Sequence, residues 1–136
     1  MAEYKSKTVT VNASNVSLFN RITDLNGLYA SIPEDKRKDV IIDGDTVKAS
    51  YAGFTIAVCI SKKLPFSLVE ISDVEAPFHF RISINLRSAE IISQTLLDIS
   101  VDADLNFMMK ALLGSKIQEY LDKFVDAVAN GGVLAE

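Results

Sequence analysis

The sequence predicts an α+β fold in which one long helix covers one face of an antiparallel sheet. Three observations lead to this prediction. Apolar and polar residues alternate along several short segments, Asp43-Gly44 separates two such segments, and a helical pattern fills residues 106–130. Alternation with a period of two places apolar side chains on one face of a strand, which is typical of an antiparallel sheet with one wet face. The dry face then needs a cover.

The first quarter of the chain predicts one strand followed by two short helices. Residues 5–11 alternate in polarity and predict the strand. Residues 14–22 predict a helix, because serine and asparagine at its start can cap free N–H groups and its apolar residues share one side. Residues 25–32 predict a second helix, which Pro33 ends because proline lacks the N–H group that a helix needs. The mixed-charge run 34–39 is typical of a solvated loop.

Six further strands are predicted in quick succession. Asp43-Gly44 indicates a type I′ hairpin between the first two of them, because this turn requires positive φ values that glycine adopts freely. Clean alternation in three of the later strands gives each of them one apolar face. The six strands are residues 40–42, 46–51, 54–61, 67–73, 78–86 and 91–101. Together with the first strand they make a seven-stranded antiparallel sheet.

The helical segment 106–130 is the predicted cover of the dry face. Asn106 is a suitable N-cap, and Asn130 followed by two glycines is a suitable C-terminal stop. Gly114 costs about 1 kcal/mol relative to alanine in a helix interior, so the pattern permits a bend there. One broad apolar stripe comprises Met109, Leu112, Leu113, Ile117, Tyr120, Leu121, Phe124 and Val128.

Composition narrows the class of protein. A length of 136 residues fits one domain that spans residues 1–136. The net charge of -4 argues against a nucleic-acid partner, which favours a basic face. Neither a signal-like start nor an apolar stretch of about 18 residues occurs, so we expect no membrane span. The single cysteine, Cys59, excludes an internal disulfide and fits a reducing compartment, so we predict a cytoplasmic protein.

No metal site or cofactor site is predicted. Residues 102–106 begin like a calcium-binding loop, but Phe107 stands at the sixth position, where the loop needs glycine. Leu113 stands at the twelfth position, where a bidentate glutamate is needed. The chain has one histidine and one cysteine, so no cluster has the spacing of a zinc site. We therefore expect neither a metal nor a cofactor.

No catalytic residue is predicted either. Cys59 and His79 are the candidates for a thiolate–imidazole pair, and both fall on the wet face of the sheet. In a meander one whole strand lies between them, which puts them roughly 10 Å apart at about 4.8 Å per strand spacing. That distance is too long for proton transfer. We expect His79 to be a surface imidazole.

The start of the long helix raises two alternatives. Phe107, Met108 and Met109 are three bulky apolar residues in a row, and they meet a sheet face that carries Ser93 and Thr95 among aliphatic residues. They can be ordinary core. Alternatively they line a pocket, since methionine suits irregular apolar space and a few hydroxyl groups orient a ligand in such sites.

Two stretches of sequence resemble a known superfamily. Residues 103–110 read ADLNFMMK, and residues 25–29 read LNGLY and are followed by the IPE of residues 32–34. With the order of elements, they resemble the helix-grip fold of the START-like, or SRPBCC, superfamily, which includes birch pollen allergens and polyketide cyclases. The first stretch is similar to small bacterial members labelled polyketide cyclase or dehydrase, whose helix opens with Asn-Pro-Met-Met. Phe107 here replaces the proline.

The resemblance implies a curved seven-stranded antiparallel sheet wrapped around the long C-terminal helix, with two short helices after the first strand. It also implies a hydrophobic cavity between sheet and helix. Carried over residue by residue, the resemblance predicts that this cavity is lined by Leu28, Tyr29, Phe54, Ile56, Phe80, Ile82, Thr95, Leu97, Met108, Met109 and Leu112.

Three functions follow as hypotheses. The first is non-catalytic binding of a small hydrophobic or lipid-like molecule in the cavity. The second is a cyclase or dehydratase acting on an apolar substrate, with hydroxyl groups from Tyr29, Thr95 and Tyr120. The third is a protein-interaction module with a filled core, whose apolar patch would include Phe66 and Phe78. The oligomeric state stays open.

Overall fold

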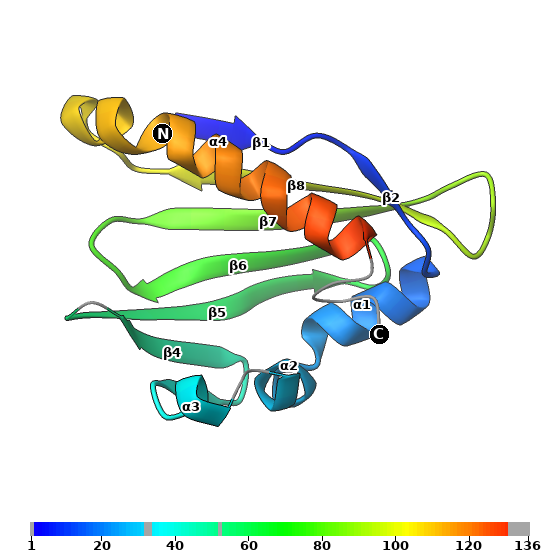
Figure 1. The fold of residues 1–136 in the computed structure, drawn as a ribbon, viewed down its shortest axis with the longest axis horizontal. Helices are drawn as coiled ribbons and strands as arrows, with labels where there is room; N and C mark the ends of the chain where they lie inside the picture. Colours follow the sequence, from blue (N-terminus) through cyan, green and yellow to red (C-terminus); the bar gives the residue numbers. More distant parts are fainter. Residues whose placement is uncertain (1, 32–33, 52, 131–136) are drawn as a thin grey trace.

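One antiparallel sheet carries the fold, and a long C-terminal helix lies across one of its faces (Figure 1). The computed structural model describes residues 2–31, 34–51 and 53–130. The strands are β1 (Ala2–Lys5), β2 (Val9–Val11), β3 (Val40–Asp43), β4 (Thr46–Tyr51), β5 (Phe54–Leu64), β6 (Leu68–Glu75), β7 (Phe80–Ser88) and β8 (Thr95–Ala103). The helices are α1 (Asn15–Thr23), α2 (Leu25–Ser31), α3 (Glu34–Arg37) and α4 (Phe107–Ala129).

The described strands form an eight-stranded sheet in the order β1-β8-β7-β6-β5-β4-β3, and β2 also pairs with β8. Strands from β3 to β8 follow one another as a meander, so each pairs with its neighbour in the chain. Along β8 every second residue is buried, as the alternation predicts. This confirms the α+β, helix-grip-like class of fold.

The predicted strand 5–11 is wrong in its extent, because the chain forms two short strands in its place. Both β1 and β2 pair with β8, and Ser6 lies between them. The Ser6 hydroxyl accepts a hydrogen bond from the N–H of Ile99 at 2.9 Å, so it replaces the backbone carbonyl that a continuous strand would provide. Beyond it the chain turns to α4, where the N–H of Lys7 donates to the Asp122 carboxylate at 2.8 Å.

Two further predictions of extent are wrong. The charged run 34–39 contains α3, whose two acidic residues stand in its first turn, where a helix dipole favours them. The predicted strand 91–101 begins only at Thr95. The residues before it form the β7–β8 connection, where the N–H of Gln94 donates to the carbonyl of Ile91 at 3.0 Å.

The alternation of β5 is continuous up to a bulge at Ser61, although burial does not follow the predicted faces at every residue. The register with β6 shifts between Ala57 and Val58 and again between Ile60 and Lys62. The first shift leaves Val74 of β6 without a partner and the second leaves Ser61 of β5 without one, so β5 itself gains an extra residue only at Ser61. Its pairing with β4 is continuous from Phe54 to Cys59, so Ile56 keeps its predicted face but is exposed, and Ala57 is buried on the other face. Ile60 keeps its predicted place beside the core.

The start and course of α4 follow from three residues. The side chain of Asn106 accepts a hydrogen bond from the N–H of Met109 at 2.8 Å, which confirms the predicted N-cap. The helix then runs as one element past Gly114. A Cβ atom on Gly114 would lie 3.1 Å from the hydroxyl oxygen of Tyr4, so the glycine lets α4 lie close against β1.

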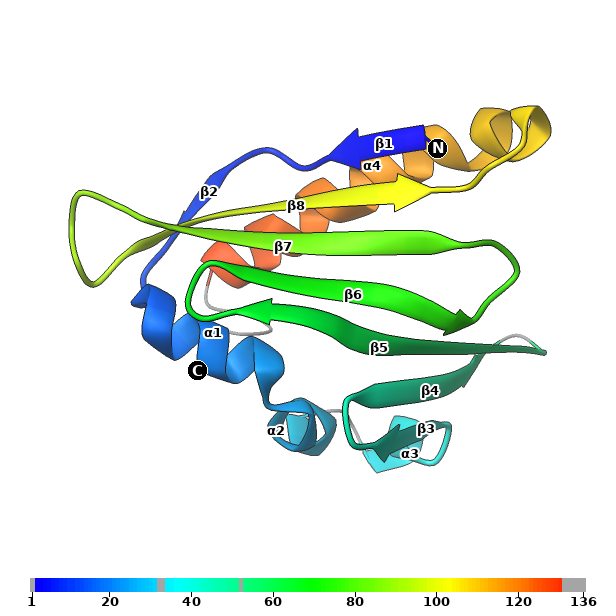
Figure 2. The ribbon, with the colours of Figure 1, turned by 180° about the vertical axis from the view of Figure 1, so that it is seen from behind.

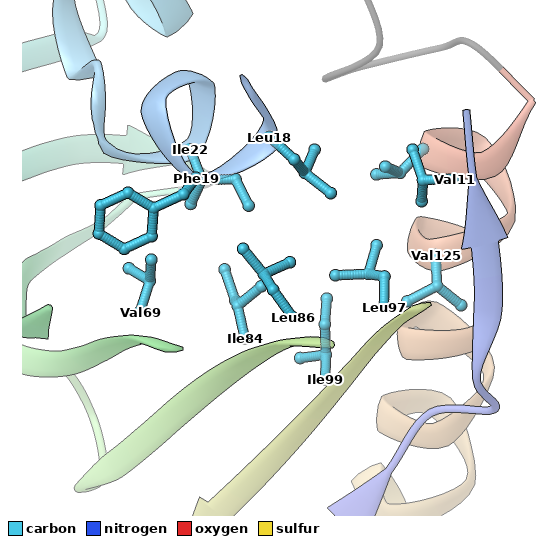
Figure 3. Packing of buried hydrophobic residues seen from close by; sticks show 11 residues of the cluster. Val11, Leu18, Phe19, Ile22, Val69, Ile84, Leu86, Leu97, Ile99 and Val125 are labelled. Atoms are coloured by element: carbon cyan, nitrogen blue, oxygen red, sulfur yellow. The ribbon is translucent and has the colours of Figure 1, made fainter. Parts of the chain in front are cut away.

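The main core lies where α1, the middle of the sheet and the second half of α4 meet (Figure 3). Leu18, Val69 and Val125 are fully buried there, and they come from α1, β6 and α4. Burial of apolar surface stabilises a fold by roughly 25 cal/mol per Å², so this cluster is the main source of stability. Its buried members are Val11, Leu18, Phe19, Ile22, Val69, Ile84, Leu86, Leu97, Ile99, Val125 and Val128.

The position of α4 on the sheet decides where a site can form. The helix packs on β1, β2 and β8, which lie at one edge of the sheet. Figures 1 and 2 show that it runs obliquely from β1 over β8 and β7, so that β4 and β5 stay uncovered. Part of the apolar face of the sheet therefore lies next to the helix without being covered by it.

Candidate ligand-binding groove

An apolar groove of about 540 Å³ lies between α4 and the neighbouring strands. Ligand pockets in proteins typically measure about 300–1,000 Å³, so this space is large enough for a small molecule. We call it the isoleucine groove. It is lined by Ile71, Ile82, Ile84, Ile99, Tyr120, Leu121, Lys123 and Phe124.

Four isoleucines from three adjacent strands form the floor of the groove. Ile71 on β6 pairs with Ile82 on β7, and Ile84 on β7 pairs with Ile99 on β8. Cross-strand partners point to the same face of a sheet, so the four side chains lie together on the side of α4. Ile84 and Ile99 are buried, whereas Ile71 and Ile82 are half-buried and accessible from the groove.

One side of α4 forms the wall. Tyr120, Leu121 and Phe124 lie within two helical turns, and Leu121 packs against the core below. The residues three and four positions apart on a helix share a side, which brings Tyr120 and Phe124 together at the mouth of the groove. Tyr120 is 67% exposed and Phe124 is 36% exposed. Leu121 therefore forms the inner part of the wall, and Tyr120 and Phe124 form an exposed aromatic rim.

The polar groups of the groove lie at this rim. Lys123 is the one charged residue among the described lining residues, and its ammonium lies 2.8 Å from the Glu119 carboxylate. A hydrogen bond to Glu119 raises the pKa of Lys123 above its usual value, and the same bond lowers the pKa of Glu119. Both groups are therefore charged at neutral pH. Tyr120 adds a hydroxyl group at the same rim.

The structure brings one of the predicted cavity residues, Ile82, to the groove. Leu97 and Thr95 lie in the core instead. The Thr95 hydroxyl donates a hydrogen bond of 2.7 Å to the carbonyl oxygen of Ala13, so it holds the chain before α1 to β8. This bond accounts for a polar side chain in full burial, because buried polar groups are costly unless they are paired.

Other predicted residues gather near the start of α4. Phe80 and Met109 pack in a second cluster around Val101, Ala103 and Leu105. The Phe80 ring lies beside that of Phe78, with centroids 5.8 Å apart. The neighbouring hollow of about 410 Å³ is lined by Ala76, Pro77, Phe78, His79, Asp104, Leu105, Asn106 and Met109.

The remaining predicted residues lie away from both spaces. Met108 and Leu112 are exposed on α4, at 70% and 66%, and Ile56 is exposed on β5. The Tyr29 hydroxyl donates to the carbonyl oxygen of Arg37 at 3.5 Å, next to α3. The side chains of Leu28 and Phe54 lie outside the described residues. That a ligand contacts these predicted residues stays a prediction.

A polar pair at the end of the sheet was missed by the sequence reasoning. Nδ1 of His79 lies 2.8 Å from Oδ2 of Asp73, and the imidazole is 83% exposed. The backbone N–H of Phe80 donates to Oδ1 of Asp73 at 2.8 Å and lowers the pKa of that carboxyl, with His79 as the next cause. The Asp73 contact raises the pKa of His79.

The partner of His79 is thus a carboxylate and not a thiol. Cys59 pairs across the sheet with Ser72, while His79 lies just before β7. The hollows next to His79 present no serine or cysteine other than Ser72 among their described lining residues. These hollows present no thiol that the imidazole could activate. The contact between His79 and Asp73 is explained instead by the position of Asp73, which binds the N–H of Phe80 at the start of β7.

Neither a metal-type cluster of side chains nor a membrane-spanning helix is found in the described part of the chain. Residues 2–31, 34–51 and 53–130 hold no group of three His, Cys, Asp or Glu side chains arranged around a common point. Within the same ranges, no helix combines the length and apolar character that crossing a lipid bilayer requires. The isoleucine groove is the candidate site because of its size and its apolar lining.

The sequence contained a signal for most of the groove. Ile84 and Ile99 fall on the predicted dry faces of their strands, and Leu121 and Phe124 fall on the predicted apolar stripe of the helix. The pairing of strands and the sideways position of α4 were needed to bring them together. Lys123 carried no such signal, because it lies on the polar side of the helical pattern.

No protein-family model matches the sequence, and no curated protein matches it. Solved structures do match. The solution structure of the Aha1 dimer from Colwellia psychrerythraea has a TM-score of 0.66 and 16% identity, and the match covers 100% of this chain and 99% of that chain. A crystal structure of an uncharacterised Bacillus thuringiensis protein has a TM-score of 0.66 and 14% identity, and the match covers 96% of this chain and 98% of that chain. A solution structure of a Thermobifida fusca protein has a TM-score of 0.68 and 12% identity, and the match covers 95% of this chain and 91% of that chain. Identities this low show a shared fold alone.

Proposed function

We propose that the isoleucine groove binds a small hydrophobic or lipid-like molecule without transforming it. The observation that carries this proposal is the floor of four isoleucines beside the aromatic rim of α4. Contact with this floor would remove apolar surface from water, which contributes roughly 25 cal/mol per Å². Catalysis by a cyclase or dehydratase is not proposed, because the titratable lining residues, Tyr120 and Lys123, lie exposed at the rim.

We also propose that the chain is a small cytoplasmic SRPBCC protein of the type labelled polyketide cyclase or dehydrase. The likeness in fold to bacterial proteins of similar length supports the superfamily. The ADLNFMMK stretch at residues 103–110 supports the subfamily. Because a fold hosts many functions, the proposal on binding depends on the groove and not on this likeness.

A neutral lipophilic dye tests the binding proposal. Nile red fluoresces in apolar surroundings, so we expect its emission to rise on titration with the protein and to saturate. The variant Ile82→Trp fills the groove, because Ile82 is half-buried and opens onto it. We expect the variant to weaken dye binding by roughly tenfold, which corresponds to about 1.4 kcal/mol of lost contact.

The matched control is Ile41→Trp, which adds the same side chain to an exposed position on β3. It should leave dye binding unchanged, and thermal unfolding should show that both variants are folded. Native mass spectrometry after mild purification adds an independent measurement of a retained ligand. Absence of a retained ligand together with absence of dye binding would overturn the proposal, as would equal binding by Ile82→Trp and the wild-type protein.

A specific surface favours a second candidate function, self-association. Phe107, Met108 and Leu112 are exposed at the start of α4, at 87%, 70% and 66%. Large exposed apolar residues next to one another mark interaction surfaces. The Colwellia psychrerythraea neighbour was solved as a dimer, which makes a second copy the partner to test first. The patch expected around Phe66 is less open, because its ring packs edge-on against Phe19 at 5.6 Å.

Sedimentation velocity over a hundredfold range of concentration tests this second candidate. We expect a dimer that Phe107→Ser dissociates, because the substitution removes the most exposed of the three side chains. Ile92→Ser is the control, since Ile92 is 90% exposed in the β7–β8 connection, away from α4. A wild-type monomer at all concentrations would rule the candidate out.

A further inference from the structure

The charges around the isoleucine groove distinguish between classes of amphipathic ligand. Among the eight described lining residues seven are uncharged, and the charged one is Lys123. No described lining residue is acidic. A ligand that lies along the isoleucines therefore meets a positive group at the mouth of the groove, which favours an anion over a cation.

The Lys123 side chain suits this role because of its position on α4. It lies three residues after Tyr120 and one before Phe124, so its stem runs beside the aromatic rim. A lysine stem packs along apolar surface while its ammonium stays in water, and the Lys123 side chain is 67% exposed. The ammonium and the Tyr120 hydroxyl can therefore both donate to one acceptor group at the mouth.

The present partner of Lys123 can be exchanged. Glu119 lies one turn earlier on the same helix and holds the ammonium at 2.8 Å, and its own side chain is 60% exposed. Exposed ion pairs of this kind contribute little to stability, because solvent screens them and both side chains lose freedom. A carboxylate anchored by an apolar chain in the groove competes with Glu119 on favourable terms, since its position is already restrained.

We infer that the ligand of the groove is an amphipathic anion of the fatty-acid class, with its chain on the isoleucine floor and its carboxylate at Lys123 and Tyr120. This inference rests on the proposed function, because it requires that the groove binds an apolar chain. The isoleucine floor supplies affinity for the chain, and the ammonium supplies selectivity for the charged head.

Two fluorescent probes that share the same apolar chain but differ in their head group test the inference. The acid is 11-(dansylamino)undecanoic acid, and the neutral probe is its methyl ester. At pH 7.5 we expect the wild-type protein to bind the acid roughly tenfold more tightly, as one charge-assisted hydrogen bond provides. Lys123→Gln should abolish this preference, because it removes the positive charge from the mouth of the groove. Lys123→Arg should keep the preference, because it retains the positive charge.

Two further variants separate a local effect from a general effect of charge. Lys110→Gln removes the same charge from an exposed position near the start of α4, outside the groove, and should leave both affinities unchanged. Glu119→Gln frees Lys123 and should strengthen binding of the acid but not of the ester. An equal loss of acid binding in Lys110→Gln and Lys123→Gln would overturn the inference.

The outcomes distinguish this inference from the proposed function. If the wild-type protein binds the acid and the ester equally, the groove binds apolar chains and the inference on the head group fails alone. If it binds neither probe and no Nile red, the proposed function fails and the inference fails with it. A preference for the ester would also overturn the inference, since it would show that the rim repels anions.

Discussion

The Asp73 carboxylate contacts His79 and Phe80 at the same time. Its Oδ2 lies 2.8 Å from Nδ1 of His79, and its Oδ1 accepts the backbone N–H of Phe80 at 2.8 Å. The pairing of β6 with β7 ends at Ser72 and Arg81, so the N–H of Phe80 has no strand carbonyl on that side. Asp73 takes the place of that carbonyl and holds the end of β7.

Removal of this carboxylate should destabilise the fold. We expect Asp73→Ala to lower the free energy of unfolding by about 1–3 kcal/mol, because it leaves the N–H of Phe80 without its partner. Urea unfolding at pH 7 measures the change. Asp45→Ala is the control, since Asp45 lies 3.4 Å from Lys63 in an exposed pair and its loss should cost at most about 1 kcal/mol. Equal effects of the two variants would contradict the role assigned to Asp73.

The same pair should make stability depend on pH in a defined window. The pKa of His79 is raised above 6.5 by its bond to Asp73, so its contribution is complete below pH 6.5 and is lost as pH rises through the folded pKa. The pKa of Asp73 is lowered below 3.8, so its contribution is complete above pH 3.8 and is lost as pH falls through the folded pKa.

The stabilisation from the pair should therefore be largest between about pH 4 and pH 6.5. We expect the stability difference between the wild-type protein and His79→Asn to be greatest near pH 5 and to shrink by pH 8. Thermal unfolding across this range measures it. A difference that stays constant from pH 5 to pH 8 would show that the imidazole acts by shape and not by charge.

The hydroxyl of Thr95 should be needed for the stability of the core. Thr95→Val keeps the shape of the side chain but removes the donor to the Ala13 carbonyl, which lies at 2.7 Å. We expect a loss of about 1–2 kcal/mol in the free energy of unfolding, because a buried acceptor stays unpaired. Thr95→Ser keeps the hydroxyl and should recover the hydrogen bond, though it loses a buried methyl group. If the valine variant is as stable as the wild-type protein, this hydrogen bond contributes nothing to the free energy of unfolding.

Replacement of Gly114 by alanine should stabilise the protein less than such a change usually does in a helix. In an open helix interior the change from glycine to alanine stabilises by about 1 kcal/mol. At this position the new Cβ would lie 3.1 Å from the Tyr4 hydroxyl oxygen, so Tyr4 must move. We expect Gly114→Ala to give clearly less than the full gain alone and close to the full gain together with Tyr4→Phe. Denaturant unfolding of the four proteins forms a double-mutant cycle, and strict additivity would contradict this contact.

The elements of the fold were largely predictable from local patterns. The alternation along β8 predicted which side chains are buried, and Asn106 predicted where α4 begins. Local patterns failed where the cause lies in another element. The strand predicted for residues 5–11 breaks because Ser6 and Lys7 bond to β8 and α4, and β5 has an unpaired residue, Ser61, in its pairing with β6.

The candidate site was less predictable than the fold. Ile82 was predicted to line a cavity and lines the groove, whereas Met108 and Leu112 lie exposed on α4. Lys123 was missed, and Tyr120 was named only as a hydroxyl group for an enzyme; both lie near the other end of the same helix. A helical pattern shows which side of a helix is apolar, but it does not show at which turn the helix leaves the sheet uncovered.

The sequence by itself determined the faces of the strands and the apolar stripe of the last helix. These properties depend on residue type and spacing alone, because periods of 2.0 and 3.6 follow from backbone geometry. Tertiary structure decided that α4 lies along the edge formed by β1, β2 and β8. That position follows from contacts between distant segments, such as Tyr4 against Gly114 and Lys7 against Asp122, and it leaves the isoleucine groove beside the helix.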